Sequence, residues 1–360
     1  MIQASPWVTL DTEADSLHHY IEKLCLVQIS VPDHDLVIDP LAPIDLKPLI
    51  HILQKKPLVL HGADFDLRIL KKTYGFEPAE IFDTMIAAQL LGYEKQGLAD
   101  LAHRHCEVTL PKSAQKADWS ERPLDETLLT YAANDTHYLP VIAERMTEEL
   151  KALGRLEWHR QTCQKLIRTI QAAKEEKADA ETAWQIKGSK VLKGPALTIL
   201  RELWHWREEE ARKRDRPSFK VLNAETMIDI SQWAAVNPDM DVALMPKAPR
   251  PLKNEYRDVL NHAIQKAKTM PQALFGRKAG GQKPKFWSEE SKAKLALLKA
   301  ERDKLGKELA IQPSLLATNA ALEVLALELP KDAEALKKSV SLMPWQIETA
   351  GDQFLKVISG

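Results

Sequence analysis

The chain has 360 residues, of which 44% are hydrophobic and 28% are charged. These proportions are typical of an ordinary globular protein and exclude a disordered or fibrous chain. The length exceeds what one hydrophobic core usually serves, so it predicts two or three domains. The net charge of −1 hides an asymmetry, because residues 1–150 carry 13 Lys and Arg against 24 Asp and Glu, and residues 151–360 carry 37 against 27. An acidic front half suits multivalent cations, and a basic rear half suits a polyanion such as nucleic acid.

The sequence contains no run of 18 apolar residues, and its first residues, MIQASPWVTLD, lack the basic start and apolar stretch of a signal peptide. The three cysteines, Cys25, Cys106 and Cys163, are odd in number and far apart. This pattern argues against a disulfide framework and favours a reducing compartment, so we expect a cytoplasmic protein without membrane contact. His103 and His105 join Cys106 in the sequence HRHC, but no second cluster completes a zinc site. We interpret HRHC as the end of a helix.

Four strand-like runs come first along the chain: WVTL at 7–10, LCLVQIS at 24–30, DLVIDP at 35–40 and PLVLH at 57–61. Apolar residues at helical spacing follow around residues 67–70, 98–102 and 128–132. The fourth strand runs directly into a helix at HGADFDLRIL. Strands followed by helices predict an α/β unit, a mixed sheet flanked by helices, that ends near residue 150.

The rear half has a helical pattern throughout. Residues 151–183, rich in Lys, Glu, Gln and Ala, predict one long connecting helix, and two helical modules follow at 184–271 and 287–360. A Gly-rich basic linker at 272–286 separates them. Each module has a charged helix, a break at Pro217 or Pro313, a pair of apolar residues and a shorter helix. We interpret this as a weak internal repeat of a small all-α domain.

Candidate carboxylates lie at three places in the front half. Asp11 and Glu13 end the first strand, and because side chains alternate along a strand, both point to the same face. Taken alone, this pair is more simply a solvated strand end. Where the fourth strand meets its helix, Asp64 is placed to cap the helix and Asp66 lies in the first turn as the functional candidate.

Tyr131 and Asp135 are four residues apart on a predicted helix and therefore share a face. Alone, they are more simply an exposed helix pair. Taken together with the other three acidic candidates, Asp135 completes a set of four carboxylates that would repel strongly without cations. Two divalent ions about 3.5–4 Å apart would neutralise them and form a phosphodiester-cleaving centre. The all-oxygen ligand set favours Mg²⁺ or Mn²⁺ over zinc, and Tyr131 would orient the attacking water.

Six segments resemble, in order, the successive motifs of the ribonuclease D family and its eukaryotic exosome-associated relatives, within the DEDD exonuclease superfamily. They are LDTEAD, EKLCLVQIS, HGADFDLRIL, FDTMIAAQLLGY, KSAQKADWSERPL and YAANDTHYL, and they span roughly residues 7–145. Tyr131, four residues before Asp135, matches the tyrosine subtype. ELWHWREEEARKRDRPSFKVL resembles the HRDC domain, and the degenerate second module, ending MPWQIETAGDQFLKVI, stands where bacterial ribonuclease D has its second copy.

The resemblance implies a ribonuclease H-like mixed-sheet exonuclease domain at 1–150, followed by two small all-α HRDC domains. It also implies a hydrolytic 3′-5′ exoribonuclease that trims tRNA precursors or other structured RNA and releases nucleoside 5′-monophosphates. Two divalent ions would be held by Asp11, Glu13, Asp66 and Asp135, and Tyr131 would position the water. Further residues in the motif segments are expected along the nucleotide path: Gln28, His61, Lys112, Gln115 and Trp119.

Two alternatives stay open. A DNA 3′-5′ exonuclease would use the same four carboxylates, because only a contact to the 2′-hydroxyl separates the two polymers. A catalytically inert RNA-binding scaffold would use the helical modules alone, although all five motif positions are filled.

The charge asymmetry predicts where RNA with a free 3′ end is gripped. Residues 184–222 carry 10 Lys and Arg against 5 Asp and Glu, and residues 247–285 carry 10 against 2. We expect these segments to hold phosphates, and a chain ending near residue 183 to keep cleavage of short RNA. Solvated helix faces or protein docking explain the same charges equally well. The linker cations expected to take part are Arg277, Lys278, Lys283 and Lys285.

Overall fold

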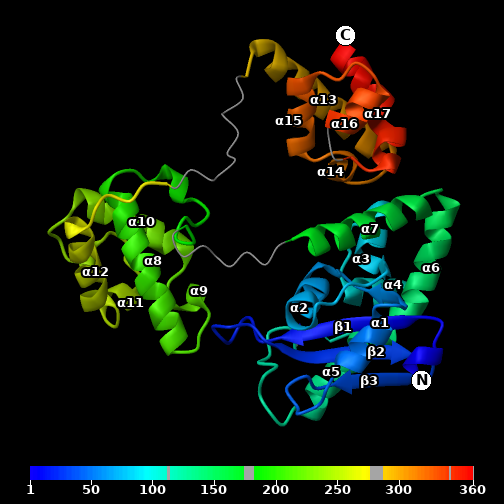
Figure 1. The fold of residues 1–360 in the computed structure, drawn as a ribbon, viewed down its shortest axis with the longest axis horizontal. Coiled ribbons are helices and arrows are strands. Elements are labelled where there is room, and N and C mark those ends of the chain that lie inside the picture. Colours follow the sequence, from blue (N-terminus) through cyan, green and yellow to red (C-terminus); the bar gives the residue numbers. More distant parts are fainter. Residues whose placement is uncertain (112–113, 174–181, 276–286, 340–341, 360) are drawn as a thin grey trace. The chain divides into compact units, whose positions relative to one another are not determined.

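The computed structural model describes residues 1–111, 114–173, 182–275, 287–339 and 342–359, and the chain divides into two compact units (Figure 1). The first unit comprises residues 1–14, 24–174 and 284–360, and the second comprises residues 15–23 and 175–283. Among the described helices, none is long and apolar enough to cross a membrane.

A five-stranded mixed sheet forms the centre of the first unit. Its strands are β1 (Val8–Ala14), β2 (Leu24–Val31), β3 (His34–Ile38), β4 (Pro57–Leu60) and β5 (Glu80–Asp83), in the order β3-β2-β1-β4-β5. The pairs β1–β2 and β2–β3 are antiparallel, and β1–β4 and β4–β5 are parallel. The predicted mixed sheet and its first four strands are confirmed. The short strand β5 was not predicted.

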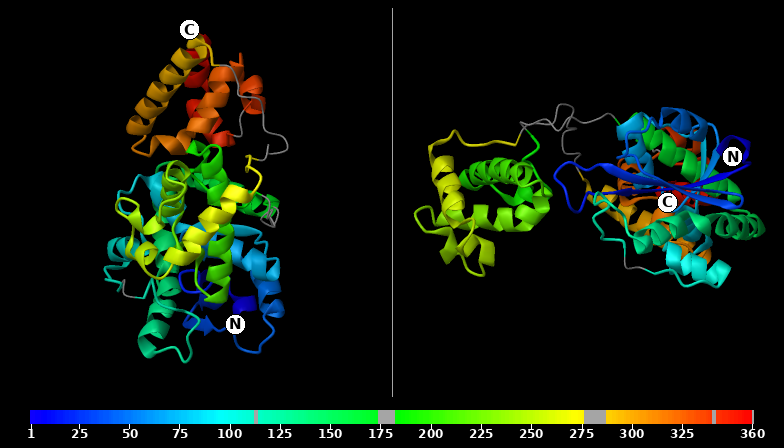
Figure 2. Two further views of the ribbon diagram at one scale, coloured as in Figure 1. Left: turned by 90° about the vertical axis from the view of Figure 1, so that its left-hand side faces the viewer. Right: turned by 90° about the horizontal axis from the view of Figure 1, so that it is seen from below.

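Helices cover both faces of this sheet (Figure 2). Along β1 the side chains alternate: Val8 and Leu10 enter a core that includes Leu67, whereas Thr9 donates a hydrogen bond to the Thr136 carbonyl on the other side. The two faces of β1 therefore meet different helices. The helices of this part are α1 (Lys47–Leu53), α2 (Asp64–Tyr74), α3 (Thr84–Leu91), α4 (Leu98–Cys106), α5 (Glu126–His137), α6 (Leu139–Ala152) and α7 (Leu156–Ala172). As predicted, HRHC ends a helix, α4.

The predicted connecting helix over 151–183 is wrong in its first part. Helix α6 ends at Ala152, and Gly154 has a φ of 68°, a left-handed conformation that glycine adopts without strain and that interrupts a right-handed helix. Helix α7 then begins at Leu156 and buries Cys163 and Ile167 against the sheet. It is part of the α/β domain rather than a free connector. Residues 174–181 of the predicted helix lie outside the described residues.

The predicted internal repeat is visible in the two helical modules. Helices α8 (Pro195–Lys213), α9 (Ser218–Val221) and α10 (Ala224–Val236) correspond to α13 (Glu289–Glu308), α14 (Pro313–Leu316) and α15 (Asn319–Glu328). In each module a buried arginine, Arg207 or Arg302, pairs with the next residue and donates to a carbonyl fifteen residues further on. The first module ends with α11 (Arg250–Lys253) and α12 (Arg257–Thr269), and the second with α16 (Ala333–Ser339) and α17 (Pro344–Ser359).

The second helical module shares a hydrophobic core with the α/β domain. Leu90, Met146 and Leu150 belong to the same buried cluster as Leu305 and Trp345. This packing explains why residues 284–360 fall into the first unit, whereas the first helical module belongs to the second.

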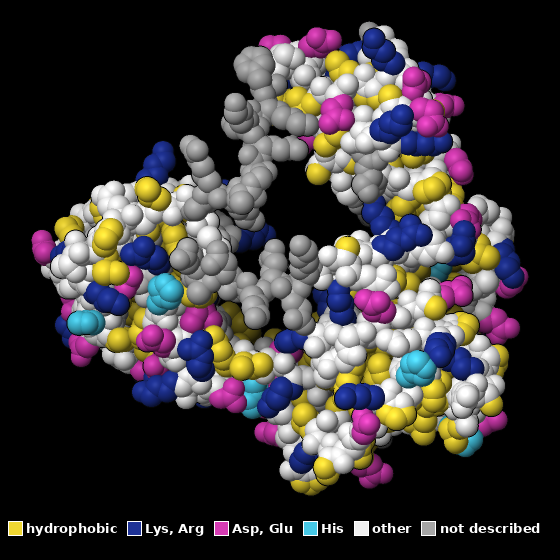
Figure 3. All heavy atoms as spheres, in the orientation of Figure 1, with side chains coloured by type: hydrophobic (Ala, Val, Ile, Leu, Met, Phe, Trp, Pro, Cys, Tyr) yellow, Lys and Arg dark blue, Asp and Glu magenta, His cyan; other side chains and the backbone are white. Residues whose placement is uncertain are grey.

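Some basic residues of the first helical module form internal ion pairs. Lys266 reaches Glu202 at 2.9 Å, Arg257 reaches Asp241 at 2.6 Å, and Arg214 pairs with Glu210. In Figure 3, dark blue and magenta side chains alternate over this module on the face drawn. The positive charge counted in its sequence is therefore partly balanced locally, which weakens the expectation of a single RNA-gripping face.

Candidate active site

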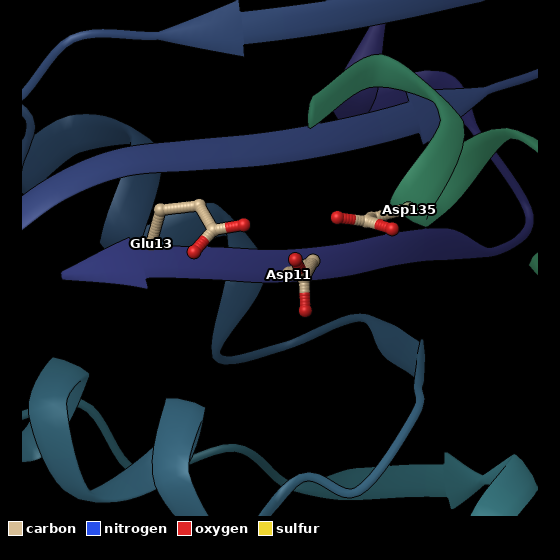
Figure 4. A group of neighbouring side chains, drawn as sticks. All are labelled: Asp11, Glu13 and Asp135. Atoms are coloured by element: carbon tan, nitrogen blue, oxygen red, sulfur yellow. The ribbon is translucent and has the colours of Figure 1, made fainter. Parts of the chain in front are cut away.

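Three of the four predicted carboxylates meet at one point. Asp11 and Glu13 project from the same face of β1, as their spacing predicted, and Asp135 faces them from α5 (Figure 4). One carboxylate oxygen from each lies within 4.8 Å of the others. All three side chains are partly exposed, so the cluster is open to a ligand from solvent.

The fourth carboxylate, Asp66, is held by a different contact. It lies in the first turn of α2 and is only 4% exposed, and the hydroxyl of Thr12 donates a hydrogen bond of 2.5 Å to its Oδ1. Thr12 sits between Asp11 and Glu13 on β1, so the same strand that supplies two carboxylates orients a third. The prediction that Asp64 caps α2 is wrong. Ala63 is the N-cap residue, and Asp64 is exposed and paired with Arg68 at 2.7 Å, one helical turn later.

Burial raises the pKa of all four carboxyl groups, and the charges of neighbouring carboxylates raise it further. Burial raises the pKa of Asp11 well above its usual value, and Asp66 and Asp135 raise it further. Burial also raises the pKa of Glu13 to about 8, and those of Asp66 and Asp135 to about 7. Without a cation, the site favours retaining protons near neutral pH.

The site fits a divalent metal ion. Its converging donors are carboxylate oxygens, the ligands that Mg²⁺ and Mn²⁺ prefer, and a bound cation would remove the repulsion that raises their pKa values. Gln28 lies opposite Asp11 in the β1–β2 register and is fully buried. Its amide oxygen and nitrogen have no hydrogen-bond partner in the described part of the chain. An occupied site with its water would offer such partners.

Tyr131 stands one helical turn before Asp135 and is 9% exposed. Burial raises the pKa of its hydroxyl, and the charges of Asp135, Glu13 and Asp11 raise it further, so the hydroxyl stays protonated. The side chain of Gln115 is hydrogen-bonded to it. Trp119, expected on the nucleotide path, is instead 1% exposed and packs with its ring centroid 6.1 Å from that of Tyr131. Trp119 therefore supports Tyr131 from the core.

Asp83, a residue that the sequence reasoning missed, fixes the segment that carries Asp66. Its buried carboxylate accepts hydrogen bonds from the backbone of Gly62 and Ala63, at 3.0 and 2.8 Å, and from Met85, at 2.8 Å. The end of β4, the start of α2 and the start of α3 are thereby joined. The sequence could have indicated this role. In the motif FDTMIAAQLLGY, Asp83 follows two apolar residues and precedes a helix, which is the pattern of a helix N-cap.

Of the other residues predicted to contact RNA, the structure describes His61 but not the five cations named below. His61 lies at the end of β4, hydrogen-bonded through Nδ1 to the Thr84 hydroxyl at 2.9 Å, and burial lowers its pKa. The lowered pKa favours the neutral imidazole at pH 7. Five predicted cations lie outside the described residues: Lys112, Arg277, Lys278, Lys283 and Lys285.

The raised pKa values make the metal-free protein sensitive to pH. A carboxyl group whose pKa is higher in the folded state contributes stability at acidic pH that is lost as the pH rises through the folded value. With unfolded values of about 4 and folded values of about 7 for Asp66 and Asp135 and about 8 for Glu13, the loss should span about pH 4 to 8.

We therefore expect Mn²⁺ to raise the melting temperature more at about pH 8.5 than at about pH 6, because ionised carboxylates need the cation. Thermal unfolding in EDTA and in Mn²⁺ at both pH values measures this. In EDTA at the higher pH, an Asp135→Asn variant should melt above the unchanged protein. Equal melting temperatures with and without Mn²⁺ at both pH values would contradict the expectation.

Comparison with known proteins places this geometry in a family. Residues 1–151 match the family described as 3′-5′ exonuclease, and residues 196–239 and 291–358 match the HRDC domain. The ribonuclease D of Gluconacetobacter diazotrophicus is 30% identical over all of this chain and 89% of its own length. That of Sphingobium indicum is 35% identical over 64% of this chain and 60% of its own length.

Solved structures give the same fold. Escherichia coli RNase D, described as an exoribonuclease involved in structured RNA processing, superposes with a TM-score of 0.68 and 23% identity. The match covers 99% of this chain and 94% of that one, so the predicted architecture of a mixed-sheet exonuclease domain followed by two all-α domains is confirmed. The full-length identity, the exonuclease match and the shared fold agree, and this chain belongs to the ribonuclease D family of 3′-5′ exoribonucleases.

Proposed function

We propose that this protein shortens RNA stepwise from a free 3′-hydroxyl by hydrolysis that requires two divalent ions, releasing nucleoside 5′-monophosphates. Its natural substrates on this proposal are tRNA precursors or other structured RNAs with single-stranded 3′ ends. The observation that carries the proposal is the convergence of Asp11, Glu13 and Asp135, with one oxygen of each within 4.8 Å, inside a domain of the exonuclease family.

The four acidic residues have two roles in this proposal. Asp11, Glu13 and Asp135 hold metal directly, because their oxygens converge. Asp66, fixed by Thr12, completes the negative field from its buried position. When bound, Mg²⁺ or Mn²⁺ supplies a positive charge for the phosphate and lowers the pKa of a nearby water.

Tyr131 positions the attacking water. Its protonated hydroxyl can donate a hydrogen bond and accept one, and it lies beside Asp135 within the carboxylate cluster. Because that pKa is raised, the hydroxyl does not act as a base at neutral pH. It orients the water rather than deprotonating it.

Tyr131→Phe should lower kcat by about 10²- to 10⁴-fold, the usual loss for one group that handles the reacting water. The ring keeps its packing against Trp119, so RNA affinity and Mn²⁺ affinity should stay close to those of the unchanged protein. Single-turnover cleavage together with binding to RNA in Ca²⁺ separates the two quantities. A variant that loses affinity but keeps kcat would make Tyr131 a structural residue.

Matched RNA and DNA oligonucleotides with a 5′ label and a 3′-hydroxyl test the proposal directly. We expect a ladder of RNA products in Mn²⁺ or Mg²⁺, release of 5′-monophosphates and no products in EDTA. Faster shortening of DNA than of RNA would favour the DNA alternative. Activity of the unchanged protein in excess EDTA would exclude the metal-dependent mechanism.

A further inference from the structure

Three hollows on the surface of the first unit adjoin one another. The smallest, about 90 Å³, is lined by Gln115, Tyr131 and Asp135 and opens beside the candidate active site. It shares Asp100 and Leu110 with a larger hollow of about 850 Å³. Because the shared residues line both, the larger hollow continues the surface that begins at the active site.

A third hollow extends the same surface onto the second helical module. Its volume is about 410 Å³, and it shares Gly92 and Tyr93 with the larger hollow. Its far wall includes Lys307, an exposed cation at the last turn of α13. The three hollows are therefore neighbours in a row from Asp135 past Tyr93 to Lys307, and together they are called the groove here.

Arg104, the exposed arginine of HRHC, presents a flat group in the middle of this groove. The guanidinium carbon lies 4.0 Å from the centroid of the Tyr93 ring. Tyr93 is itself fixed, because its hydroxyl donates a hydrogen bond of 2.5 Å to Glu149, and its ring stacks near His105. The Arg104 guanidinium is thus held beside the Tyr93 ring, and its side chain is exposed.

The charge along the groove is balanced rather than strongly positive. The larger hollow is lined by the cations Lys95 and Arg104 with His103, and by the acids Glu94, Asp100 and Glu149. This mixture does not fit a cluster of phosphates. It does fit bases and riboses, since an arginine plane stacks on a base and a carboxylate accepts a hydrogen bond from a 2′-hydroxyl.

We propose that this groove holds the single-stranded RNA upstream of the cleavage site, with one base stacked on the Arg104 guanidinium and a phosphate near Lys307. The inference rests on the proposed function, because it assumes that the 3′ end lies at Asp135. It assigns Arg104 as an RNA-binding residue and Tyr93 as the residue that positions it. It also gives the second helical module a direct part in substrate binding.

Cleavage of a dinucleotide and of a long unstructured RNA, compared in Mn²⁺, tests the inference. On this proposal the dinucleotide occupies only the start of the groove beside Asp135, whereas the long RNA extends past Arg104. Arg104→Lys keeps the charge and removes the plane, so kcat/KM for the long RNA should fall about tenfold to a hundredfold, the loss expected for one stacking contact. This decrease in kcat/KM should result from a higher KM, with kcat unchanged.

Further variants separate stacking, charge and folding. Arg104→Gln should weaken cleavage of long RNA as Arg104→Lys does, whereas Tyr93→Phe, which keeps the ring beside Arg104, should retain most of the affinity for long RNA. Lys307→Gln, which removes the proposed phosphate contact, should reduce the slope of log affinity against log salt by about 0.7. Arg68→Gln is the matched control, because Arg68 is exposed and paired with Asp64 outside the groove. It should cleave both substrates like the unchanged protein.

Two results would overturn the inference, and they differ from each other. If Arg104→Lys and Arg104→Gln cleave long RNA as well as the unchanged protein does, the groove is not the RNA path. The same conclusion follows if kcat/KM falls as much for the dinucleotide as for the long RNA. In both cases the proposed function stands. If the unchanged protein cleaves neither substrate, the proposed function itself fails and the inference falls with it.

Discussion

Asp11→Asn should reduce RNA cleavage to background while the protein stays folded. Asp11 lies among three other carboxylates, and its pKa is raised by burial and by Asp66 and Asp135. The amide keeps the shape of the side chain and removes one of the repelling charges, so the metal-free fold should not suffer. Loss of a residue that only orients a metal ligand typically costs about 10- to 100-fold in metal affinity, and loss of a direct ligand should cost more.

Asp66→Asn should lower Mn²⁺ affinity and RNA cleavage by about 10- to 100-fold, because it removes a negative charge that supports the three direct ligands. The fold should persist, because the Asn carbonyl can still accept the hydrogen bond from Thr12. Shortening of a labelled RNA measures cleavage, and titration with Mn²⁺ followed by calorimetry measures metal binding. Asp64→Asn is the matched control. Asp64 is two residues away on the same helix but exposed and paired with Arg68, so its loss should leave both quantities unchanged. Full cleavage by Asp11→Asn would exclude Asp11 as a metal ligand.

The sequence predicted those features of the site that depend on local periodicity. Alternation along a strand was enough to place Asp11 and Glu13 on one face, and helical spacing was enough to place Tyr131 beside Asp135. The position of Asp66 in the first turn of α2 also followed from the strand-to-helix transition. These relations hold over a few residues and need no tertiary information.

The parts that were missed depend on contacts between distant segments. Asp83 has the sequence signature of an N-cap, but only the fold shows that its carboxylate also binds the backbone of Gly62 and Ala63. The sequence motif placed Trp119 among residues expected to line the nucleotide path. Only the fold shows that it is buried against Tyr131. The sequence pattern alone could not show whether either side chain is exposed to solvent or buried in the core.

The association of the second helical module with the α/β domain is the largest such feature. Arg155 donates to the carbonyl of Leu90 and to that of Leu309, each at 2.7 Å, and so joins α3, α7 and the end of α13. At Gly92, a Cβ atom would lie 2.0 Å from the carbonyl oxygen of Ala310, so the close approach there requires glycine. Nothing in the local pattern of residues 287–360 indicates these partners.

These contacts argue against the expectation that a chain ending near residue 183 keeps its activity. Such a chain would expose the core residues of α3, α4 and α6 that pack against the second helical module. Removing the second helical module would therefore remove part of the core of the α/β domain itself. A single substitution in this shared core offers a cleaner test than truncation.

Trp345→Ala should lower the free energy of unfolding of the first unit by about 3–5 kcal/mol, the usual cost of removing a large buried aromatic side chain. Trp345 is 1% exposed and stacks on Trp158 of α7, with ring centroids 4.6 Å apart and planes 16° from parallel. Its backbone nitrogen also donates to the side chain of Gln161 in the same helix. The lost packing therefore lies between the helical module and the domain that carries the carboxylates.

Urea unfolding followed by loss of RNA cleavage measures the effect on the α/β domain itself. Trp206→Ala is the matched control, because Trp206 packs on Tyr256 in the first helical module, within the second unit. Both variants should weaken their own module, but only Trp345→Ala should shift the urea midpoint of cleavage to lower concentration. If cleavage were lost at the same urea concentration in both variants and in the unchanged protein, the second helical module would be an independent arm. Its shared core with the α/β domain would then contribute nothing to holding the carboxylates in place.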